Sequence, residues 1–397
     1  MKNRSLMLFI ALLSLNFKII ISNSSENTII PKTPDMQWVI IGAGPAGISV
    51  VGLLLDAGIP SNTITWIDPK FNVGRLGESY NNVPSNTQTK YFVEFIECCK
   101  TFQECNSPSL EKLFAYDPEK EYPLQIIVKP LRDITDYLCT KVIAIKDTLQ
   151  SLDFHNDVWH VGVNNHVITT RNVVLATGSH PRSLHYECDA VQISLDTALD
   201  KTLLAEQLNP TDSIAVVGSA HSAVLILKYL SELPVKRIIN FYNKPLQYAI
   251  PNPSGIINEA EGLKGITARW AQEVLEKNPP AHLIRIFNCP ESLEAWLSVC
   301  NKIIYAVGFE RNQLPLIHGD STIYNGYDNS SGIIAPGLFG IGIAFPEKIT
   351  IANGTQQPGI GLNDFIEYAQ RVLPVWITRA CTKKLLLFKN LFTITSL

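Results

Sequence analysis

The stretch Trp38-Val39-Ile40-Ile41-Gly42-Ala43-Gly44-Pro45-Ala46-Gly47 decides the fold of this chain. Its apolar half predicts a buried strand, and its second half predicts a tight turn that opens into a helix. Gly42 permits the turn, Gly44 lets the backbone approach a phosphate, and Gly47 lets the helix pack closely on the strand. The free amides at the helix N-terminus attract an anion. The stretch therefore predicts a site for the pyrophosphate of a dinucleotide.

An acid follows at the distance that such a site requires. Residues 48–56 predict a helix, residues 63–67 predict a second strand, and that strand ends on Asp68, 21 positions after Gly47. In dinucleotide sites an acid about 20 residues after the glycines accepts hydrogen bonds from the adenosine ribose. Asp68 is therefore the predicted ribose ligand, and an acid that only caps a turn is the alternative.

A second strand-turn-helix layout begins at residue 213. Gly218 stands 176 positions after Gly42, but Ala220 replaces the glycine that should lie closest to the pyrophosphate. Because of the Ala220 methyl group, we expect the dinucleotide to bind here more weakly or in an altered position. His221, on the same turn, is a candidate phosphate contact or a surface histidine at a helix start.

The strand after this second turn indicates the nucleotide that binds there. Residues 237–242 predict that strand, and no acid follows it; Lys244 stands near its end, with Lys236 and Arg237 close by. A cation suits the 2′-phosphate of NADPH, whereas an acid suits the ribose of NADH. The pattern favours NADPH over NADH, and three solvated surface cations are the alternative.

Length and composition exclude several classes of protein. The 397 residues fit two domains, and 46% hydrophobic and 17% charged residues are ordinary for a globular protein. A net charge of −3 without a basic stripe gives no attraction to nucleic acid, so no nucleic-acid partner is expected. The eight cysteines form no C-x-x-C pair and no metal-site spacing with histidine, so no metal site is predicted.

Both ends of the chain carry unusual segments. Lys2 and Arg4 precede the apolar residues 6–15, and small residues follow near 22–24, which is the layout of a secretory signal peptide. Residues 1–35 are therefore a predicted leader that directs the chain to the secretory pathway or to membrane association; a leader on a cytoplasmic protein is the alternative. The tail 381–397 is basic and apolar, which predicts either peripheral membrane contact or an ordinary last helix.

The motifs occur in an order that resembles a known family. Leu175-Ala176-Thr177-Gly178-Ser179 lies between the two glycine turns, and Tyr305-Ala306-Val307-Gly308-Phe309 and Gly337-Leu338-Phe339-Gly340-Ile341-Gly342 follow the second turn. This order is similar to the flavoproteins with two dinucleotide-binding domains. They include glutathione-reductase-like enzymes, flavin-containing monooxygenases and N-hydroxylating monooxygenases.

The resemblance implies an α/β fold, in which a Rossmann-like FAD-binding domain (36–206 and 311–380) carries an inserted, smaller Rossmann-like NAD(P)-binding domain (207–310). It implies FAD contacts at Gly42, Gly44, Pro45, Ala46, Gly47, Asp68, Arg75, Thr177, Gly178, Gly342 and Gly361. It implies NADPH or NADH contacts at Gly218, Ala220, His221 and Lys244. Relatives often carry an aspartate after the last glycine motif, and Ile343 stands there in this chain.

The region after the first acid indicates the type of flavin chemistry. Disulfide reductases need a cysteine pair near the flavin or the nicotinamide, but residues 74–87 contain no cysteine, and Cys98 and Cys99 are adjacent. Residues 80–87 are instead similar to a flavin-containing monooxygenase segment, which makes Asn86 the candidate catalytic residue beside flavin and nicotinamide. A structural asparagine in a turn is the alternative. The phenylalanine-glycine-histidine signature of the monooxygenases is missing, and residues 191–196 stand in its place.

The sequence thus favours an FAD-dependent oxidoreductase that takes hydride from NADPH and passes it to oxygen or a small-molecule acceptor, as a monooxygenase does. In such an enzyme the cofactor carries the electrons. One alternative is a membrane-surface dehydrogenase that reduces a quinone. Another is a flavin-binding protein without turnover that acts through partners, which Ala220 and Ile343 suggest.

Overall fold

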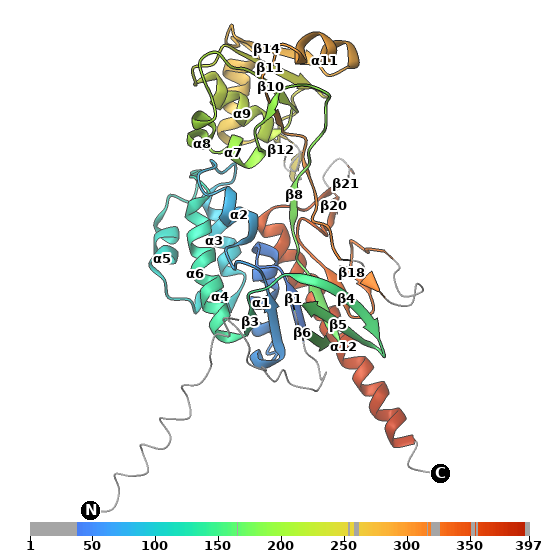
Figure 1. The fold of residues 1–397 in the computed structure, drawn as a ribbon. Coiled ribbons are helices and arrows are strands. Elements are labelled where there is room, and N and C mark those ends of the chain that lie inside the picture. Colours follow the sequence, from blue (N-terminus) through green and yellow to red (C-terminus); the bar gives the residue numbers. More distant parts are fainter. Residues whose placement is uncertain are drawn as a thin grey trace, which may run out of the picture.

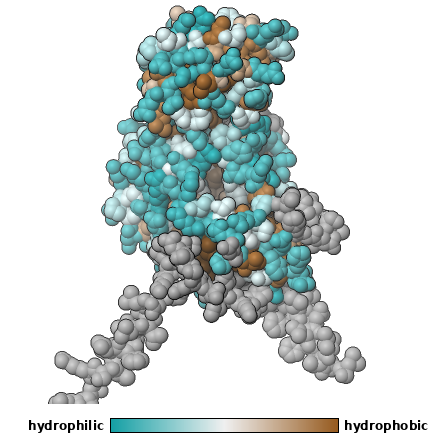
Figure 2. Space-filling model, viewed as in Figure 1, coloured by the Kyte–Doolittle hydropathy of each residue, from teal (hydrophilic) through white to brown (hydrophobic). Residues whose placement is uncertain are grey.

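The computed structural model describes residues 38–164, 166–252, 255–257, 262–315, 317–318, 326–350, 354 and 356–393 (Figure 1). The predicted leader, residues 1–35, lies outside the described residues. Two α/β domains follow one another along the long axis of the molecule, and hydrophilic residues cover most of the face seen in Figure 2.

The first domain is built on a six-stranded sheet around the glycine turn. The strand order is β18-β19-β7-β1-β2-β3, and every neighbouring pair except β18·β19 is parallel. The strands are β1 (Trp38–Ile41), β2 (Ile64–Ile67), β3 (Ile143–Ile145), β7 (Asn172–Leu175), β18 (Ile333–Ala335) and β19 (Leu338–Gly340). Both β1 and β2 are buried throughout, as strands covered on both faces must be.

Helices cover one face of this sheet and a smaller sheet covers the other. The helical layer is α1 (Pro45–Asp56), α2 (Gly74–Ser79), α3 (Thr89–Glu97), α4 (Lys100–Gln103), α5 (Pro108–Ala115), α6 (Gln125–Lys141) and α12 (Leu362–Thr393). The second layer is β17 (Ile317–His318), β4 (Leu149–His155), β5 (Val158–Val163) and β6 (His166–Thr170), in that order. Each interface has its own apolar core, so the first domain has three layers.

The second domain is a five-stranded parallel sheet in the order β14-β11-β10-β15-β9. Its strands are β9 (Val191–Gln192), β10 (Ser213–Val217), β11 (Arg237–Tyr242), β14 (Leu283–Phe287) and β15 (Lys302–Tyr305). The helices around it are α7 (Leu195–Leu199), α8 (Lys201–Glu206), α9 (His221–Ser231), α10 (Gly265–Trp270), the π-helical turn η2 (Ala271–Leu275) and α11 (Pro290–Leu297). Residues 191–206 join this sheet and its core, although the sequence placed them in the first domain.

Two short strands connect the domains. Chain entering the second domain forms β8 (Ser179–Pro181), chain leaving it forms β16 (Phe309–Arg311), and the two pair antiparallel. Asn312 ties this ribbon to the end of β7, because its Nδ2 donates to the Thr177 carbonyl at 2.7 Å and its N–H donates to the Gly178 carbonyl at 3.1 Å. Minor elements are η1 (Ser61–Thr63) and the hairpins β12 (Ile250–Asn252)·β13 (Gly255–Ile257) and β20 (Lys348–Thr350)·β21 (Gln356–Pro358).

The last helix, α12, closes the first domain and then leaves it. Trp376 is fully buried, stacks on Phe339 with ring centroids 4.5 Å apart, and donates from Nε1 to the Ser331 carbonyl at 2.7 Å. The helix continues to Thr393 and projects away from the body (Figure 1). Among the described residues, no helix combines the length and apolar character needed to span a bilayer. Membrane contact through this tail stays a prediction.

Candidate cofactor sites and the junction between the domains

The first glycine turn has the geometry of a pyrophosphate site. Gly42 has φ of +108°, and a Cβ added there would clash with the Ala176 carbonyl of the neighbouring strand segment. A Cβ added at Gly44 would meet no described atom within 4 Å, so the space beside this residue is open. Helix α1 begins at Pro45, and no described side chain caps its first amides. These amides and the open space fit a dinucleotide pyrophosphate.

Other predicted residues gather around this turn. A Cβ on Gly342 would lie 2.6 Å from the Cβ of Ala46, and a Cβ on Gly74 would lie 3.1 Å from the Cα of Gly44. Thr177 follows β7, the strand beside β1, and its Oγ1 is buried without a hydrogen-bond partner among the described residues. A buried hydroxyl without a partner is costly, and a bound ligand would supply one. The residues present therefore fit FAD.

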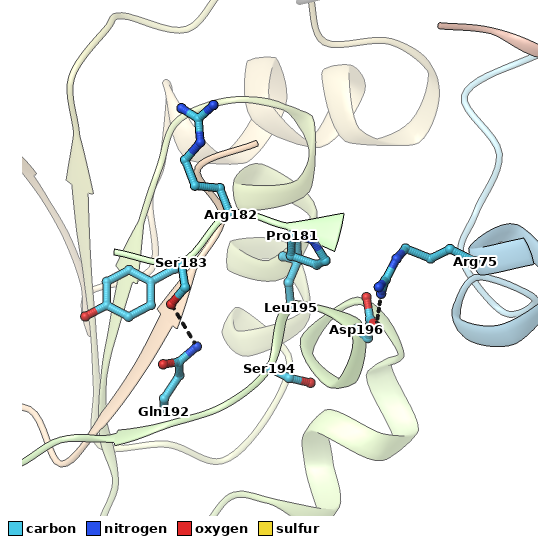
Figure 3. A pocket seen from close by; sticks show the side chains of 9 residues that line it. Arg75, Pro181, Arg182, Ser183, Gln192, Ser194, Leu195 and Asp196 are labelled. Carbon is cyan, nitrogen blue, oxygen red and sulfur yellow. Dashed lines mark hydrogen bonds and ion pairs between the residues drawn. The ribbon is translucent and has the colours of Figure 1, made fainter. Parts of the chain in front are cut away.

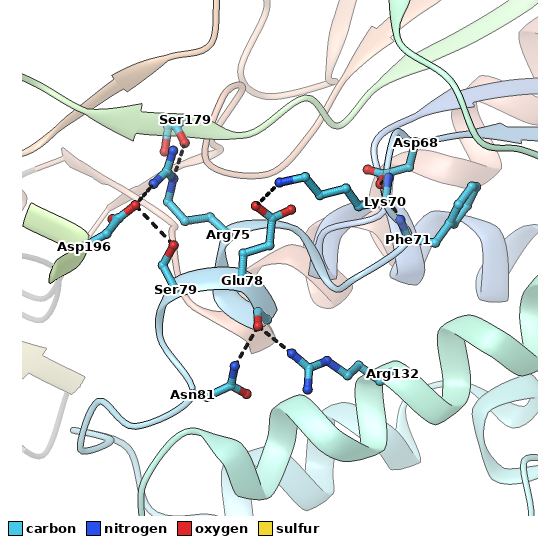
Figure 4. A network of polar contacts seen from close by, with 11 residues as sticks. Asp68, Lys70, Phe71, Arg75, Glu78, Ser79, Asn81, Arg132, Ser179 and Asp196 are labelled. Carbon is cyan, nitrogen blue, oxygen red and sulfur yellow. Dashed lines mark hydrogen bonds and ion pairs between the residues drawn. The ribbon is translucent and has the colours of Figure 1, made fainter. Parts of the chain in front are cut away.

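Asp68 holds the turn through a backbone hydrogen bond, and Figure 4 shows it beside Lys70 and Phe71. Its Oδ2 accepts from the N–H of Ala43 at 2.8 Å, and its Oδ1 accepts from the N–H groups of Lys70 and Phe71 at 2.8 and 2.7 Å. An ionised carboxylate has about four acceptor positions, so capacity for a ribose hydroxyl remains. The structure thus shows the turn-capping role, and the ribose contact stays a prediction.

Two further predicted FAD contacts already have protein partners. The Gly361 N–H donates to Asp364 Oδ2 at 2.7 Å, so a carboxylate stands at the start of α12. The Arg75 guanidinium forms an ion pair with Asp196 of α7 and donates from Nε to the Ser179 carbonyl at 3.2 Å. The structure therefore directs the Arg75 side chain to the junction with the second domain, and the FAD contacts of Arg75 and Gly361 stay predictions.

Two linked polar side chains, Asn240 and Arg285, support the second glycine turn through hydrogen bonds. Gly218 has φ of +134°, and its carbonyl accepts from Asn240 Nδ2 at 2.8 Å. Asn240 Oδ1 in turn accepts from Arg285 Nε at 3.0 Å. Ala220 is the exposed residue immediately before α9. The strand-turn-helix layout of a second dinucleotide site is present, with Ala220 in place of the expected glycine.

His221 does not offer a charge to a phosphate. Its ring packs between α9 and α10, where Nε2 lies 3.2 Å from Thr267 Oγ1, and Nδ1 is buried without a partner among the described residues. Burial, assisted by the charge of Lys264, lowers the pKa of His221 to about 4. The imidazole is therefore neutral at neutral pH. Lys244, by contrast, is exposed just beyond β11, where a 2′-phosphate is expected.

The segment with the candidate catalytic residue runs along the domain junction. Asn86 is exposed, and its Oδ1 accepts from Thr87 Oγ1 at 3.2 Å. Earlier in the segment, Val83 packs against the second domain's core, and Asn82 Nδ2 donates to Asp200 Oδ2 at 2.8 Å. The segment thus contacts the second domain, and a catalytic role for Asn86 stays a prediction.

A pocket of about 250 Å³ also lies at this junction (Figure 3). It lies beside the ion pair of Arg75 with Asp196 and beside the ribbon that links the domains. Sequence reasoning did not predict it, because no local motif joins residues from four segments. Its lining comprises Arg75, Pro181, Arg182, Ser183, Gln192, Ser194, Leu195, Asp196 and Tyr305.

The described part of the chain contains no disulfide bond. The seven cysteines described there are all free. Burial raises the pKa of Cys139 to about 12 and that of Cys300 to about 11, so these groups are protonated thiols at neutral pH. The described residues also hold no group of three or more histidine, cysteine or acidic side chains that fits a metal ion.

Comparisons with known proteins agree with this geometry. The pyridine nucleotide-disulphide oxidoreductase family matches residues 36–326. A curated relative, the monooxygenase AgnR1 of Paecilomyces divaricatus, is 29% identical, with 85% of this chain and 97% of that protein covered. The solved structure of FAD-bound OTEMO is 12% identical, with a TM-score of 0.59 and 89% and 85% of the two chains covered.

A double mutant of the flavin monooxygenase from Stenotrophomonas maltophilia is 11% identical, with a TM-score of 0.57 and 87% and 98% covered. At these identities the solved structures show the fold alone, and they confirm the predicted α/β architecture of Rossmann type. The family match spans well over half of the sequence and confirms the predicted resemblance. The chain therefore belongs to the pyridine nucleotide-disulphide oxidoreductase family and is an FAD-dependent oxidoreductase.

Proposed function

We propose that this flavoprotein is an NADPH-dependent monooxygenase that acts on a small molecule with a nucleophilic nitrogen or sulfur. FAD, when bound, supplies the redox chemistry, since it accepts a hydride and reacts in its reduced form with oxygen. The residues of this chain bind and orient the two cofactors. The observation that carries the flavin part of the proposal is the open turn at Gly44, beside the uncapped start of α1.

In the first domain, we expect three features to contribute to FAD binding. The amides at the start of α1 and the open space at Gly44 receive the pyrophosphate. Asp68 keeps the turn in shape through the Ala43 N–H and has capacity left for a ribose hydroxyl. Thr177 Oγ1, which is buried without a described partner, can donate to an acceptor on the cofactor.

In the second domain, Lys244 supports the preference for NADPH. Its ammonium is exposed beyond the end of β11, where the 2′-phosphate of NADPH carries a charge that NADH lacks. His221 is neutral and turned toward Thr267, so Lys244 is the residue in this region that we expect to distinguish the two nucleotides. The Ala220 methyl group is expected to weaken binding of either nucleotide.

Oxygen is favoured over a disulfide as the acceptor. The relative AgnR1 is named a monooxygenase, and the alignment covers 97% of its length. A disulfide reductase needs a pair of cysteines with thiolate character, and the described cysteines are unpaired. We expect the substrate that receives the oxygen atom to be a small nucleophile, such as an amine or a sulfide.

Anaerobic reduction followed by oxygen tests this function. The purified protein should be yellow and release FAD on denaturation. NADPH should bleach the flavin faster than NADH, and admission of oxygen should restore the colour with release of peroxide that falls when a substrate is present. A colourless protein that does not take up FAD contradicts the cofactor assignment. A yellow protein that neither nucleotide reduces points to a flavin-binding protein without turnover.

A second candidate is a membrane-surface dehydrogenase that passes electrons to a quinone. It is favoured by α12, which continues as a helix to Thr393 through the basic and apolar tail. In the same assay a quinone would then reoxidise the flavin much faster than oxygen does. Reoxidation by oxygen at an equal or higher rate contradicts this candidate.

A further inference from the structure

One carboxylate of the second domain receives three side chains from a single short segment of the first. Asp196 pairs with Arg75, accepts from Ser79 Oγ at 3.1 Å, and accepts from Tyr80 OH at 3.2 Å. Figures 3 and 4 show Arg75 reaching across the junction toward Asp196. Residues 75 and 79 are four positions apart on one face of α2, and Tyr80 follows directly at the end of this helix.

The same helix touches the first glycine turn. Gly74, the first residue of α2, has φ of +57° and packs so closely that an added Cβ would lie 3.1 Å from Gly44 Cα. Arg132 of α6 fixes α2 from the other side, with Nη2 donating to the Gly77 carbonyl at 2.6 Å (Figure 4). Helix α2 therefore connects the predicted FAD pyrophosphate site with Asp196.

Arg75 also contacts the β8·β16 ribbon that connects the two domains. Its Nε donates to the carbonyl of Ser179, the first residue of the connecting strand β8. A rotation of the second domain about the β8·β16 ribbon would separate Arg75 from Asp196, because one belongs to each domain. We infer that Arg75 is a positioning residue, which acts through Asp196 to hold the second domain where a bound nicotinamide can reach the flavin. This inference rests on the proposed function.

The expected effect follows from the demands of hydride transfer. Transfer needs the two reacting atoms close together and aligned, and a displacement of about 1 Å can lower a rate on the order of 100-fold. The side chains of Arg75 and Asp196 are 32% and 31% exposed, so salt partly screens their attraction. We therefore expect Asp196→Asn to lower the limiting rate of anaerobic flavin reduction by NADPH roughly 10- to 100-fold. Rising ionic strength should lower the wild-type rate toward that of the variant.

Three comparisons separate positioning from a general structural defect. Asp196→Asn should keep its FAD content, its melting temperature and its rate of reduction by dithionite, which does not need the second domain. The doubly exchanged variant Arg75→Asp/Asp196→Arg should recover much of the lost rate. Glu232→Gln is the matched control, because the pair of Glu232 with Lys201 at 2.7 Å lies wholly within the second domain.

The outcomes keep the two claims apart. If NADPH reduces the wild type and Asp196→Asn equally fast, the positioning role is wrong and the proposed function stands. If neither nucleotide reduces the wild type, the proposed function is wrong, and small-angle X-ray scattering then decides whether Arg75 holds the domains. An unchanged scattering profile for Asp196→Asn overturns that role, whereas a profile that shifts only in this variant and not in Glu232→Gln supports it.

Discussion

Gly44→Ala separates cofactor binding from folding more cleanly than any other change in the first domain. The backbone φ of Gly44 is −76°, which any residue adopts, and the added methyl group would meet no described atom within 4 Å. The folded chain can therefore hold alanine here without strain. The methyl group would, however, occupy the space that we assign to the FAD pyrophosphate.

The expected changes in apoprotein stability and in FAD affinity follow from two opposed effects on the apoprotein and one effect on the complex. Gly→Ala at a compatible φ stabilises by about 0.4–1 kcal/mol, while alanine is a poorer residue than glycine before a helix by a similar amount. The free energy of unfolding of the apoprotein should therefore change by less than about 1 kcal/mol. Overfilling a packed site costs roughly 1–3 kcal/mol, so the Kd for FAD should rise roughly 5- to 150-fold.

Titration of the apoprotein with FAD, followed by quenching of flavin fluorescence, measures this change. Gly47→Ala is the contrasting variant, because its Cβ would clash with the Gly42 carbonyl, and it should lower the stability of the apoprotein itself. The reasoning is refuted if Gly44→Ala binds FAD as tightly as the wild type. It is equally refuted if the apoprotein of Gly44→Ala unfolds as readily as that of Gly47→Ala.

The remaining predictions concern the second domain and the tail. Lys244→Ala should raise KM for NADPH roughly ten-fold and leave KM for NADH unchanged. Lys236→Ala is the control, because Lys236 precedes β11 and so lies at the opposite end of the strand from Lys244. Equal effects of Lys244→Ala on both nucleotides contradict the 2′-phosphate contact. The folded pKa of His221 is lowered from 6.5 to about 4, so the unfolded chain protonates first as the pH falls and stability is lost below about pH 6.5. The loss is on the order of 1 kcal/mol near pH 5.5, and His221→Asn should abolish it in a series of melting curves; an unaltered pH profile speaks against burial of the ring. Truncation after residue 380 should reduce binding to anionic vesicles, and unchanged partitioning would rule out membrane contact through the tail.

The sequence predicted the parts of the fold that depend on local geometry. Gly42 and Gly218 both have positive φ and end a buried parallel strand, as the two strand-turn-helix patterns require. Asp68 lies beside the first turn because the spacing places it at the end of the adjacent strand. Such features are fixed by a few neighbouring residues, so one sequence is enough to identify them.

Features that join distant segments were not predicted. Arg75 and Asp196 are 121 positions apart, and only the packing of two domains brings them together. His221 turns inward because α10, almost 50 residues later, covers it, and no pattern near the second turn signals that cover. Strand β9 is only two residues long, so it has no periodicity that would have moved the domain boundary to residue 191.

The paired connecting strands also bear on how such a chain can be built. In the β8·β16 ribbon Ser179 lies opposite Arg311, so the chain enters and leaves the second domain at neighbouring points. An insertion whose ends meet leaves its host core uninterrupted. We therefore expect that the second domain can be removed or replaced as a unit. If a short turn replaces the residues between β8 and β16, the shortened protein should still fold and bind FAD. A flavoprotein of this design can acquire a different electron donor by exchanging one segment, without any change to the residues that hold its flavin.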